Sequence, residues 1–300
     1  MRKAVSISLG SSERDKEVTV ELNGVEINIR RVGTDGDVER AHRMFAELDG
    51  KVDCLSVGGV DLYLPLGEHE YPLHAALKLV DGVHTTPVVD GRGLKHTLER
   101  RVFELVKLQL PEIPRFRQAF VPVVVDRLGL AEAANDISDR VVIGDLMVAL
   151  GLPFPIYGLP AYQRVGKILL PLVSYFPMSM LFYGSNKNEV YHPKFVKFWQ
   201  ESDLLAGDFL FMRKYVPDDL SGKWVVTNTT TEKNVDFLRE RGVSMLITTT
   251  PRYEGRSFGT NMMEAALTAY AGLGRVLTKN ELNQLIDELK LVPSVQKLNG

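Results

Sequence analysis

Residues 224–249, with the sequence WVVTNTTTEKNVDFLRERGVSMLITT, decide the fold. The apolar runs at Trp224–Asn228 and Ser244–Thr249 are typical of buried strands. Between them, Thr229-Thr230-Thr231-Glu232 has the spacing of a helix capping box, and Gly242 is typical of the residue that follows a helix. A strand, a helix and a strand in this order predict a right-handed crossover between two parallel strands, and therefore an α/β fold.

Further strands are predicted on the N-terminal side of this unit. Val121–Val125 is an unbroken apolar run, which suits a strand buried on both faces of a parallel sheet. Val141–Asp145 and Leu205–Phe211 are read as two more strands. We therefore expect a Rossmann-like domain over residues 118–275, with a mainly parallel sheet and an apolar helical insertion at 146–184.

A first α/β domain is expected over residues 1–112. Asn23-Gly24 lies between two alternating runs, which is the strongest short-range signal for a β-hairpin. Apolar residues at helical spacing predict an amphipathic helix over Gly93–Leu108. At the other end of the chain, Thr278–Glu281 has capping-box spacing, and a C-terminal helical segment is expected over residues 276–300.

Composition narrows the classes of function. The 300 residues carry 36 Lys and Arg against 38 Asp and Glu, and this balance argues against nucleic acid as a partner. The single cysteine, Cys54, excludes an internal disulfide and is read as a buried, inert thiol. The short apolar run at the N-terminus is not a signal peptide, so we expect a cytoplasmic protein. Histidine spacing gives no support for a metal site.

The apolar insertion is not expected to cross a membrane, because Pro171 and Pro177 interrupt it. We expect it to cover the sheet, to line a substrate pocket or to form the interface of a homodimer. A membrane or partner docking surface is a further alternative.

The loops that follow strands are where parallel α/β sheets bind ligands. In the loop Asp90–His96, Lys95 is a candidate for exchanging a proton with a hydroxyl group, and Asp90 is a candidate for orienting it. The alternative is a helix start with solvated basic residues.

A dinucleotide would be expected at the turn after Val125, where Gly-x-Gly-x-x-Gly lets the pyrophosphate approach the backbone. Only Gly129 of that pattern is present, while Asp145 has about the spacing of a ribose-binding acid. The residues expected to contact NAD or NADP are Asp126, Gly129, Asp145, Thr227, Asn228 and Thr229.

An anion or cofactor site is expected in the loop Thr248–Asn261, which ends at a helix N-terminus and carries Arg252 and Arg256. A second candidate is Leu9-Gly10-Ser11-Ser12 after the first strand, although a tight turn into the hairpin is the favoured interpretation of this loop. The residues expected to bind an anion or the substrate are Ser11, Ser12, Thr249, Thr250, Arg252, Arg256, Ser257 and Asn261.

Several of these stretches resemble a bacterial family often labelled quinate 5-dehydrogenase. The stretches are Ser8–Ser12, Gly33–Asp37, Thr86–Arg100 and Thr248–Asn261, and the similarity spans most of the chain. The resemblance implies kinship with shikimate and quinate dehydrogenases: a substrate domain followed by a Rossmann domain, NAD or NADP, and a Lys/Asp pair acting on a ring hydroxyl. Asp90 and Lys95 are the positions carried over for that pair. In those enzymes the lysine and aspartate lie on separate segments, whereas these two share a loop.

Two functions therefore stay open. One is an NAD(P)-dependent oxidoreductase acting on a hydroxylated cyclic carboxylate such as quinate or shikimate. The other is a non-catalytic α/β protein that binds a small anionic ligand and has lost dinucleotide binding, which the missing glycines favour.

Overall fold

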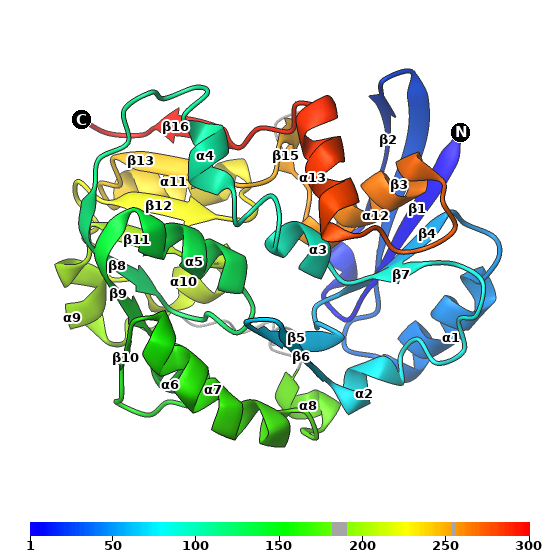
Figure 1. The fold of residues 1–300 in the computed structure, drawn as a ribbon, viewed down its shortest axis with the longest axis horizontal. Helices are drawn as coiled ribbons and strands as arrows, with labels where there is room; N and C mark the ends of the chain where they lie inside the picture. Colours follow the sequence, from blue (N-terminus) through cyan, green and yellow to red (C-terminus); the bar gives the residue numbers. More distant parts are fainter. Residues whose placement is uncertain (182–190, 254–255) are drawn as a thin grey trace. The chain divides into compact units, whose positions relative to one another are not determined.

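The computed structural model describes residues 1–181, 191–253 and 256–300, and of residues 252, 253, 256 and 257 it describes the backbone alone (Figure 1). The chain forms two compact units. Unit 1 contains Met1–Leu94, Ile168–Lys187 and Gly259–Lys290, and unit 2 contains Lys95–Lys167, Asn188–Phe258 and Leu291–Gly300. Each unit is thus built from several segments, unlike the contiguous domains that the sequence predicted over 1–112 and 118–275.

Unit 2 contains a seven-stranded sheet in the order β10-β9-β8-β11-β12-β13-β16. Its strands are β8 (Phe116–Val121), β9 (Ser138–Ile143), β10 (Ile156–Tyr157), β11 (Leu204–Ala206), β12 (Trp224–Thr227), β13 (Met245–Thr248) and β16 (Ser294–Lys297). The five central strands are parallel, and the two edge strands β10 and β16 are antiparallel to their neighbours. This mainly parallel sheet confirms the predicted α/β fold class.

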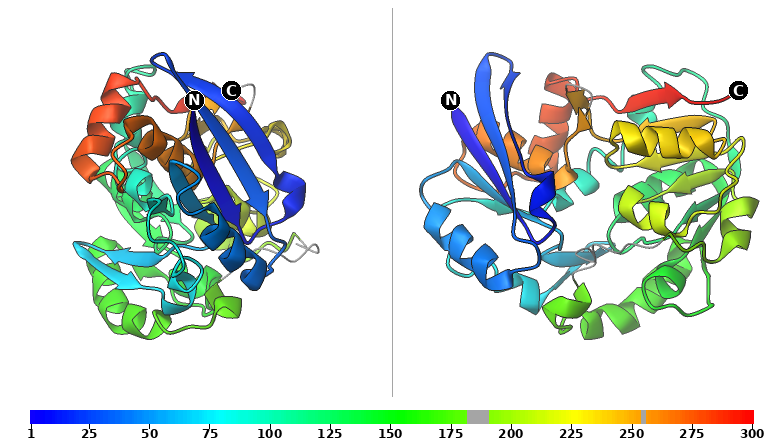
Figure 2. Two further views of the ribbon diagram at one scale, coloured as in Figure 1. Left: turned by 90° about the vertical axis from the view of Figure 1, so that its right-hand side faces the viewer. Right: turned by 180° about the vertical axis from the view of Figure 1, so that it is seen from behind.

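The helices of unit 2 lie on both faces of this sheet. They are α4 (Val102–Val106), α5 (Leu128–Asp136), α6 (Asp145–Val148), most of α7 (Leu159–Val173), α9 (Val196–Glu201), α10 (Phe209–Tyr215) and α11 (Glu232–Glu240). Helix α5 covers one face, and α10 and α11 cover the other (Figures 1 and 2). The core beneath α10 and α11 includes the fully buried Phe120, Trp199 and Phe209.

The β12–α11–β13 crossover is confirmed. The side chain of Thr231 caps α11 by accepting a hydrogen bond from Asn234 N, and Gly242 follows the helix with φ of 80°. The cap is Thr231 rather than Thr229, so the helix begins two residues later than the capping-box spacing indicated.

The predicted strand over Leu205–Phe211 is wrong in its second half. Strand β11 ends at Ala206, and Asp208 begins α10 by accepting a hydrogen bond from Leu210 N. The apolar run 209–212 is therefore the start of a helix that buries Phe209 and Met212 and exposes Leu210, and a short apolar run cannot be assigned to helix or strand by periodicity alone.

Unit 1 contains a five-stranded sheet in the order β2-β3-β1-β4-β7. Its strands are β1 (Arg2–Ser8), β2 (Lys16–Leu22), β3 (Val25–Gly33), β4 (Cys54–Gly58) and β7 (Val88–Val89), beside the hairpin of β5 (Tyr63–Leu66) and β6 (His69–Pro72). Strands β3, β1, β4 and β7 are parallel, and β2 is antiparallel to β3. The turn between β2 and β3 has positive φ at both Asn23 and Gly24, which confirms the predicted hairpin.

The helices of unit 1 are η1 (Ser12–Arg14), α1 (Val38–Leu48), α2 (His74–Leu77), most of α3 (Arg92–Lys95), α8 (Met178–Leu181), α12 (Thr260–Ala271) and α13 (Lys279–Glu288). Helix α12 packs on β1, β3 and β4. Cys54 is fully buried on β4, and burial raises the pKa of its thiol, as expected for an inert cysteine.

Two predicted helices are shorter than expected. The helix expected over Gly93–Leu108 is two short helices, α3 and α4, joined by turns. The C-terminal segment 276–300 begins with the predicted capping box, in which Thr278 and Glu281 bond reciprocally, but α13 ends at Glu288 and the chain then forms β16.

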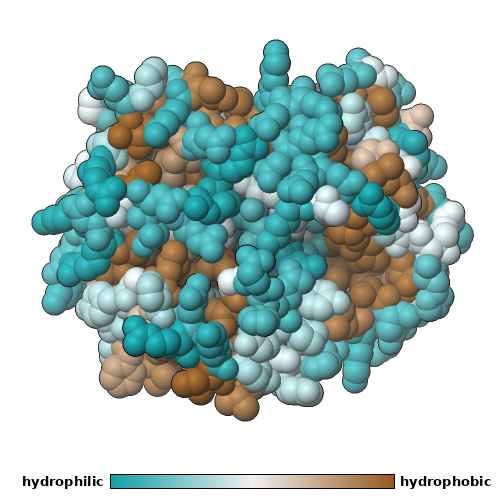
Figure 3. Space-filling model, viewed as in Figure 1, coloured by the Kyte–Doolittle hydropathy of each residue, from teal (hydrophilic) through white to brown (hydrophobic). Residues whose placement is uncertain are grey.

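The apolar stretch expected at 146–184 contains α6, β10, α7 and α8. Among the described residues, no helix combines the length and apolar character that a membrane span requires. Ile168, Leu172 and Tyr175 are exposed, and Figure 3 shows hydrophobic residues on this face where α7 runs. Its use as a homodimer interface stays a prediction.

Candidate functional site

Charged side chains meet at the carboxyl edge of the unit 2 sheet. Strand β8 lies between β9 and β11, so the crossovers on either side of it run in opposite directions and create the topological switch point where α/β sheets bind ligands. The loop after β8 carries Asp126 and Arg127, and the turn after β11 carries Asp208.

Arg127 is the centre of this arrangement. Its Nη1 donates to Glu99 Oε1 at 2.7 Å, its Nη2 donates to Asp208 Oδ2 at 2.8 Å, and its Nε lies 3.0 Å from Asp126 Oδ2. The side chains of Arg127 and Glu99 are 6% and 0% exposed. Such buried charges are tolerated only when they are paired, and here the pairing fixes the orientation of three carboxylates.

Lys95 completes a second pair on the same edge. Its Nζ donates to Asp126 Oδ1 at 2.6 Å, and the two side chains are 8% and 23% exposed. Asp126 therefore bridges Lys95 and Arg127, one through each carboxylate oxygen.

Asp208 connects the loop after β11 with the loop after β12. Its Oδ2 accepts from Asn228 Nδ2 at 2.8 Å as well as from Arg127, and its Oδ1 accepts from Leu210 N at 2.8 Å. Thr227 Oγ1 lies 3.1 Å from Asn228 Oδ1 and fixes the amide. We name six residues the switch-point cluster: Lys95, Glu99, Asp126, Arg127, Asp208 and Asn228.

The cluster holds three carboxylates against two cations, a formal charge of one negative unit. Asp126 and Asp208 keep 23% and 14% of their side chains exposed, so this edge of the cluster is partly open to solvent. Oriented carboxylates beside a lysine and an amide can accept hydrogen bonds from hydroxyl groups and donate others to them.

Asp145, the expected ribose-binding acid, has a different use in the structure. Its two oxygens accept hydrogen bonds from Val124 N and Val125 N at 2.8 and 2.9 Å, and so it holds the loop after β8. Burial raises its pKa to about 6, and the backbone hydrogen bonds oppose that rise. The carboxylate of Asp145 therefore has a structural use in this loop.

Gly129 lies in the first turn of α5, where a pyrophosphate would approach. A Cβ at this position would lie 2.0 Å from the carbonyl oxygen of Lys95. The backbone of Lys95, rather than a ligand, occupies the space against this turn. Together with the carboxylates of Glu99 and Asp126 nearby, this arrangement does not fit the pyrophosphate of NAD or NADP.

The threonine-rich ends of β12 and β13 are buried. Thr250 Oγ1 lies 2.8 Å from the carbonyl oxygens of Asn228 and Phe258, and Thr249 Oγ1 is buried without a hydrogen-bond partner among the described residues. Thr229 is half-buried in the loop that leads to α11. Of the threonines expected at a ligand, Thr250 has a structural use, and Thr249 and Thr229 stay candidates.

Asp90, in unit 1, organises its own loop. Its Oδ2 accepts from Leu62 N at 2.8 Å and its Oδ1 accepts from Arg92 N at 3.1 Å. Lys95 belongs to unit 2 and has Asp126 as a carboxylate partner. The two residues that the sequence placed together thus serve different units.

Asn261, expected to bind an anion, ties two strands of unit 1 together. Its Nδ2 lies 2.9 Å from Ser6 Oγ, 3.3 Å from Ser56 Oγ and 3.2 Å from the carbonyl oxygen of Val57. This amide is therefore committed to the contact of α12 with β1 and β4.

Ser11 and Ser12 also have partners inside unit 1. Ser11 Oγ accepts from Glu13 N at 3.2 Å, and Ser12 N donates to Asp35 Oδ1 at 2.9 Å. Arg252, Arg256 and Ser257 belong to the short strands β14 (Arg252–Tyr253) and β15 (Arg256–Ser257), and their side chains lie outside the described part of the chain. Anion binding by these three residues stays a prediction.

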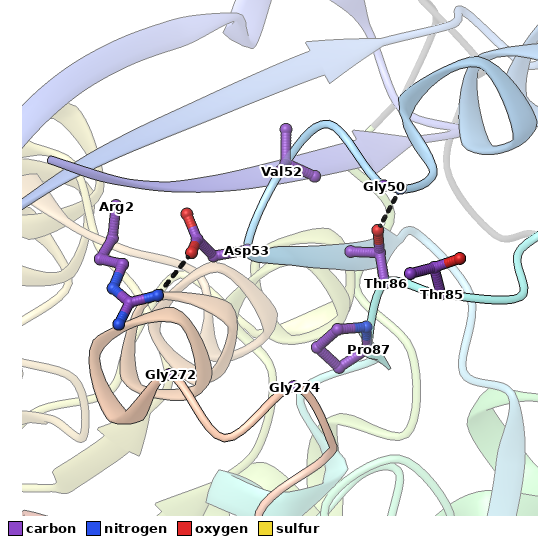
Figure 4. Close-up of a pocket in the computed structure, with 9 residues that line it drawn as sticks. All are labelled: Arg2, Gly50, Val52, Asp53, Thr85, Thr86, Pro87, Gly272 and Gly274. Carbon is purple, nitrogen blue, oxygen red and sulfur yellow. Dashed lines mark hydrogen bonds and ion pairs between the residues drawn. The ribbon is translucent and has the colours of Figure 1, made fainter.

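A hollow of about 200 Å³ lies at the amino end of the unit 1 sheet (Figure 4). Its polar groups pair with one another: Arg2 Nη1 with Asp53 Oδ1 at 2.8 Å, and Gly50 N with Thr86 Oγ1 at 2.7 Å. Because ligands of parallel sheets bind at the carboxyl ends of strands, we assign no function to this hollow.

Sequence reasoning missed Glu99 and Asp208 and gave Arg127 no role. No local signal distinguished Glu99, which the sequence places beside the charged residues Arg100 and Arg101 between Leu98 and Val102. Asp208 was hidden inside the predicted strand over Leu205–Phe211, although an Asp directly after a glycine is a common helix start.

Comparison with known proteins assigns no activity to the chain. A family described as "Domain of unknown function (DUF8754)" matches residues 93–298, and one described as "Domain of unknown function (DUF8753)" matches residues 3–90. No curated protein matches the sequence.

Three solved structures illustrate the remote structural similarities. An NAD-dependent malic enzyme from Thermotoga maritima is 11% identical, with 96% of this chain and 76% of that chain covered and a TM-score of 0.40. An ABC transporter solute-binding protein from Burkholderia multivorans is 11% identical, with 99% of both chains covered and a TM-score of 0.37. A galactofuranose-binding protein is 12% identical, with 96% of this chain and 98% of that chain covered and a TM-score of 0.31. Similarities this remote assign neither an activity nor a ligand.

Proposed function

Since the chain belongs to the family described as a domain of unknown function (DUF8754), we propose its function from its own residues: the switch-point cluster of unit 2 binds a small molecule that carries several hydroxyl groups. The observation that carries this proposal is the position of Asp126, a partly exposed carboxylate bridging the buried Lys95 and Arg127 at the switch point.

A hydroxylated ligand suits the chemistry of the cluster. Asp126 and Asp208 are held by cations, so their oxygens can accept hydrogen bonds from hydroxyl groups without first being reoriented. Lys95 and the Asn228 amide supply donors on the same edge. An anionic ligand, as the sequence led us to expect, would have to overcome the excess of carboxylates in this cluster.

The ligand is proposed to bind without a nicotinamide cofactor. The carbonyl oxygen of Lys95 fills the space beside Gly129, and both oxygens of Asp145 hold the loop after β8. We therefore favour a ligand binder over the dehydrogenase, and propose a hydroxylated ligand in place of the anionic one that the sequence led us to expect.

One observation favours an enzyme as the second candidate. Lys95 Nζ and Asp126 Oδ1 are 2.6 Å apart, and the two residues lie on separate segments, as the lysine and aspartate do in the shikimate and quinate dehydrogenases that the sequence resembles. Such a pair can take a proton from a substrate hydroxyl or return it. In this alternative, Asp126 replaces Asp90 as the partner of Lys95, and the substrate is a hydroxylated cyclic carboxylate such as quinate or shikimate.

Calorimetric titration tests the proposal with a fixed set of probes: ribose, galactose, myo-inositol, quinate, shikimate, NAD and NADP. We expect binding of at least one hydroxylated probe to the wild type, weakened about tenfold or more in Asp126→Asn, because a charge-assisted hydrogen bond is lost. Asp139→Asn is the matched control, since Asp139 forms an exposed ion pair with Arg115 elsewhere in unit 2. Equal affinity in the wild type and Asp126→Asn would refute the site.

Absorbance at 340 nm separates the two candidates. The proposed binder gives no change with quinate or shikimate and either nucleotide. Turnover by the wild type that is abolished in Lys95→Ala would establish the enzyme instead, whereas turnover unaffected by Lys95→Ala would remove Lys95 from the chemistry.

A further inference from the structure

Two arginines of unit 1 lie over one glycine at the carboxyl end of β1. A Cβ on Gly10 would lie 2.7 Å from Nη2 of Arg14 and 3.1 Å from Nη2 of Arg31. Nη2 of Arg14 and Nη2 of Arg31 are therefore no more than about 5.8 Å apart. A side chain at this position would require the Arg14 guanidinium to move.

Arg31 is fixed in place by the fold. Its Nη2 donates to Ser8 Oγ at 3.0 Å, and its Nη1 donates to the carbonyl oxygen of Ser11 at 3.0 Å and to Asp15 Oδ1 at 2.9 Å. Its side chain is largely buried. Burial and the neighbouring charge of Arg14 lower the pKa of Arg31, which indicates that the two like charges repel each other.

Arg14 has no comparable anchor. Within the described part of the chain, its guanidinium forms no hydrogen bond and no ion pair. It lies near Arg31, whose charge is offset by Asp15. Asp15 offsets the charge of Arg31, and Asp35 accepts from Ser12 N. Asp15 and Asp35 match the two arginines in formal charge, so the repulsion comes from the short distance between the two guanidiniums, and an anion placed between them would relieve it.

The position of the pair is that of a ligand site. Strand β1 lies between β3 and β4 in the unit 1 sheet, and β3 and β4 follow it in sequence on opposite sides. The loop after β1 is thus at the switch point of this sheet, where ligands of α/β folds bind. The polar atoms of the pair face the same edge as the buried Ser8 hydroxyl.

We propose that a phosphate-type oxyanion binds between Arg14 and Arg31 above Gly10. A tetrahedral oxyanion presents oxygens in several directions and can accept hydrogen bonds from two guanidinium groups that do not share a plane. This site belongs to unit 1 and does not depend on the function proposed for unit 2.

Titration with inorganic phosphate tests the proposal, with chloride used to keep the ionic strength constant. We expect saturable binding to the wild type and an affinity about tenfold lower in Arg14→Gln. Gly10→Ala should also weaken binding, because the methyl group displaces the Arg14 guanidinium from its place beside Arg31. The matched control is Arg43→Gln, which removes another exposed arginine of unit 1 and should leave the affinity unchanged.

Three outcomes would overturn the proposal: no saturable phosphate binding by the wild type, equal affinity in Arg14→Gln, or an equal loss in Arg43→Gln. Sulfate and acetate serve as further probes, and acetate binding as tight as phosphate binding would replace the phosphate class with a carboxylate. Asp126→Asn should keep the phosphate affinity, so failure of this site and failure of the unit 2 site can be told apart.

Discussion

Glu264 keeps its carboxyl group inside unit 1, where only 3% of the residue is exposed. Burial raises its pKa to about 8, and the charge of Asp90 adds to the rise, while the hydrogen bond from Leu94 N opposes it. The folded pKa therefore lies above the unfolded value of about 4.3. The stabilisation is complete below the unfolded pKa and is lost as the pH rises toward and through the folded pKa.

We accordingly expect Glu264→Gln to flatten the stability profile between about pH 4.3 and pH 8, the interval between the unfolded and folded pKa values. Between about pH 5 and pH 8 the Tm of the wild type should fall more steeply than that of the variant, because glutamine has no proton to lose. Scanning calorimetry at closely spaced pH values measures this. Glu240→Gln, at an exposed glutamate of α11, should follow the wild type. Parallel profiles for Glu264→Gln and the wild type would contradict the assignment of a buried, proton-binding carboxyl.

Single residues also show which contacts the sequence can predict: local helix caps, but not pairs that are distant along the chain. Thr278 was identifiable as a helix cap, and the cap at Thr231 was predicted two residues too early. Both signals are local, because a cap and its partner lie within three residues of each other. The partners of Arg127 are different, since Glu99 and Asp208 are 28 and 81 residues away along the chain. No local pattern encodes such a pairing, so the cluster that carries the proposed function emerged only from the fold.

At the scale of an element, α5 depends on a close approach at its first turn. Alanine favours a helix over glycine by about 1 kcal/mol, so Gly129→Ala would stabilise α5 if space allowed. The Lys95 carbonyl oxygen, 2.0 Å from the position that the new methyl group would take, denies that space. We expect Gly129→Ala to lower the free energy of unfolding by about 1–3 kcal/mol, the usual cost of overpacking, as measured by urea denaturation.

The matched control for this substitution is Gly82→Ala. Its new Cβ would meet Ala46 Cβ at 3.2 Å, a contact that a small shift can relieve. It should therefore cost much less than Gly129→Ala. A Gly129→Ala variant as stable as the wild type would mean that Lys95 is not held against α5, and would reopen that turn to a nucleotide.

Elements with short-range signals were predicted well, and those defined by context were not. The β2–β3 hairpin and the β12–α11–β13 crossover follow from turn and cap residues next to them in sequence. Helix α10 was partly read as strand, because a short apolar run is compatible with either structure and burial in the core decides between them.

At the scale of the whole molecule, the sequence predicted two α/β units but not which segments build each. Contiguous domains were expected, whereas unit 1 also takes residues 259–290 from the far end of the chain. Helix α12 in that segment is buried along most of its length and packs on β1, β3 and β4. Helix α12 covers this sheet from more than 150 residues away along the chain, so no local sequence pattern indicates the contact.

This division predicts how fragments of the chain behave. Residues 1–94 alone should not fold cooperatively, because without α12 the apolar face of β1 and β4 is exposed and Asn261 no longer bridges Ser6 and Ser56. The same residues joined by a flexible linker to 259–290 should regain a cooperative thermal transition by circular dichroism and dispersed amide signals by NMR. In that fusion Leu267→Asp, at a fully buried position of α12, should abolish both. A cooperative transition of residues 1–94 alone would show that the N-terminal segment is a domain in its own right, as the sequence first indicated.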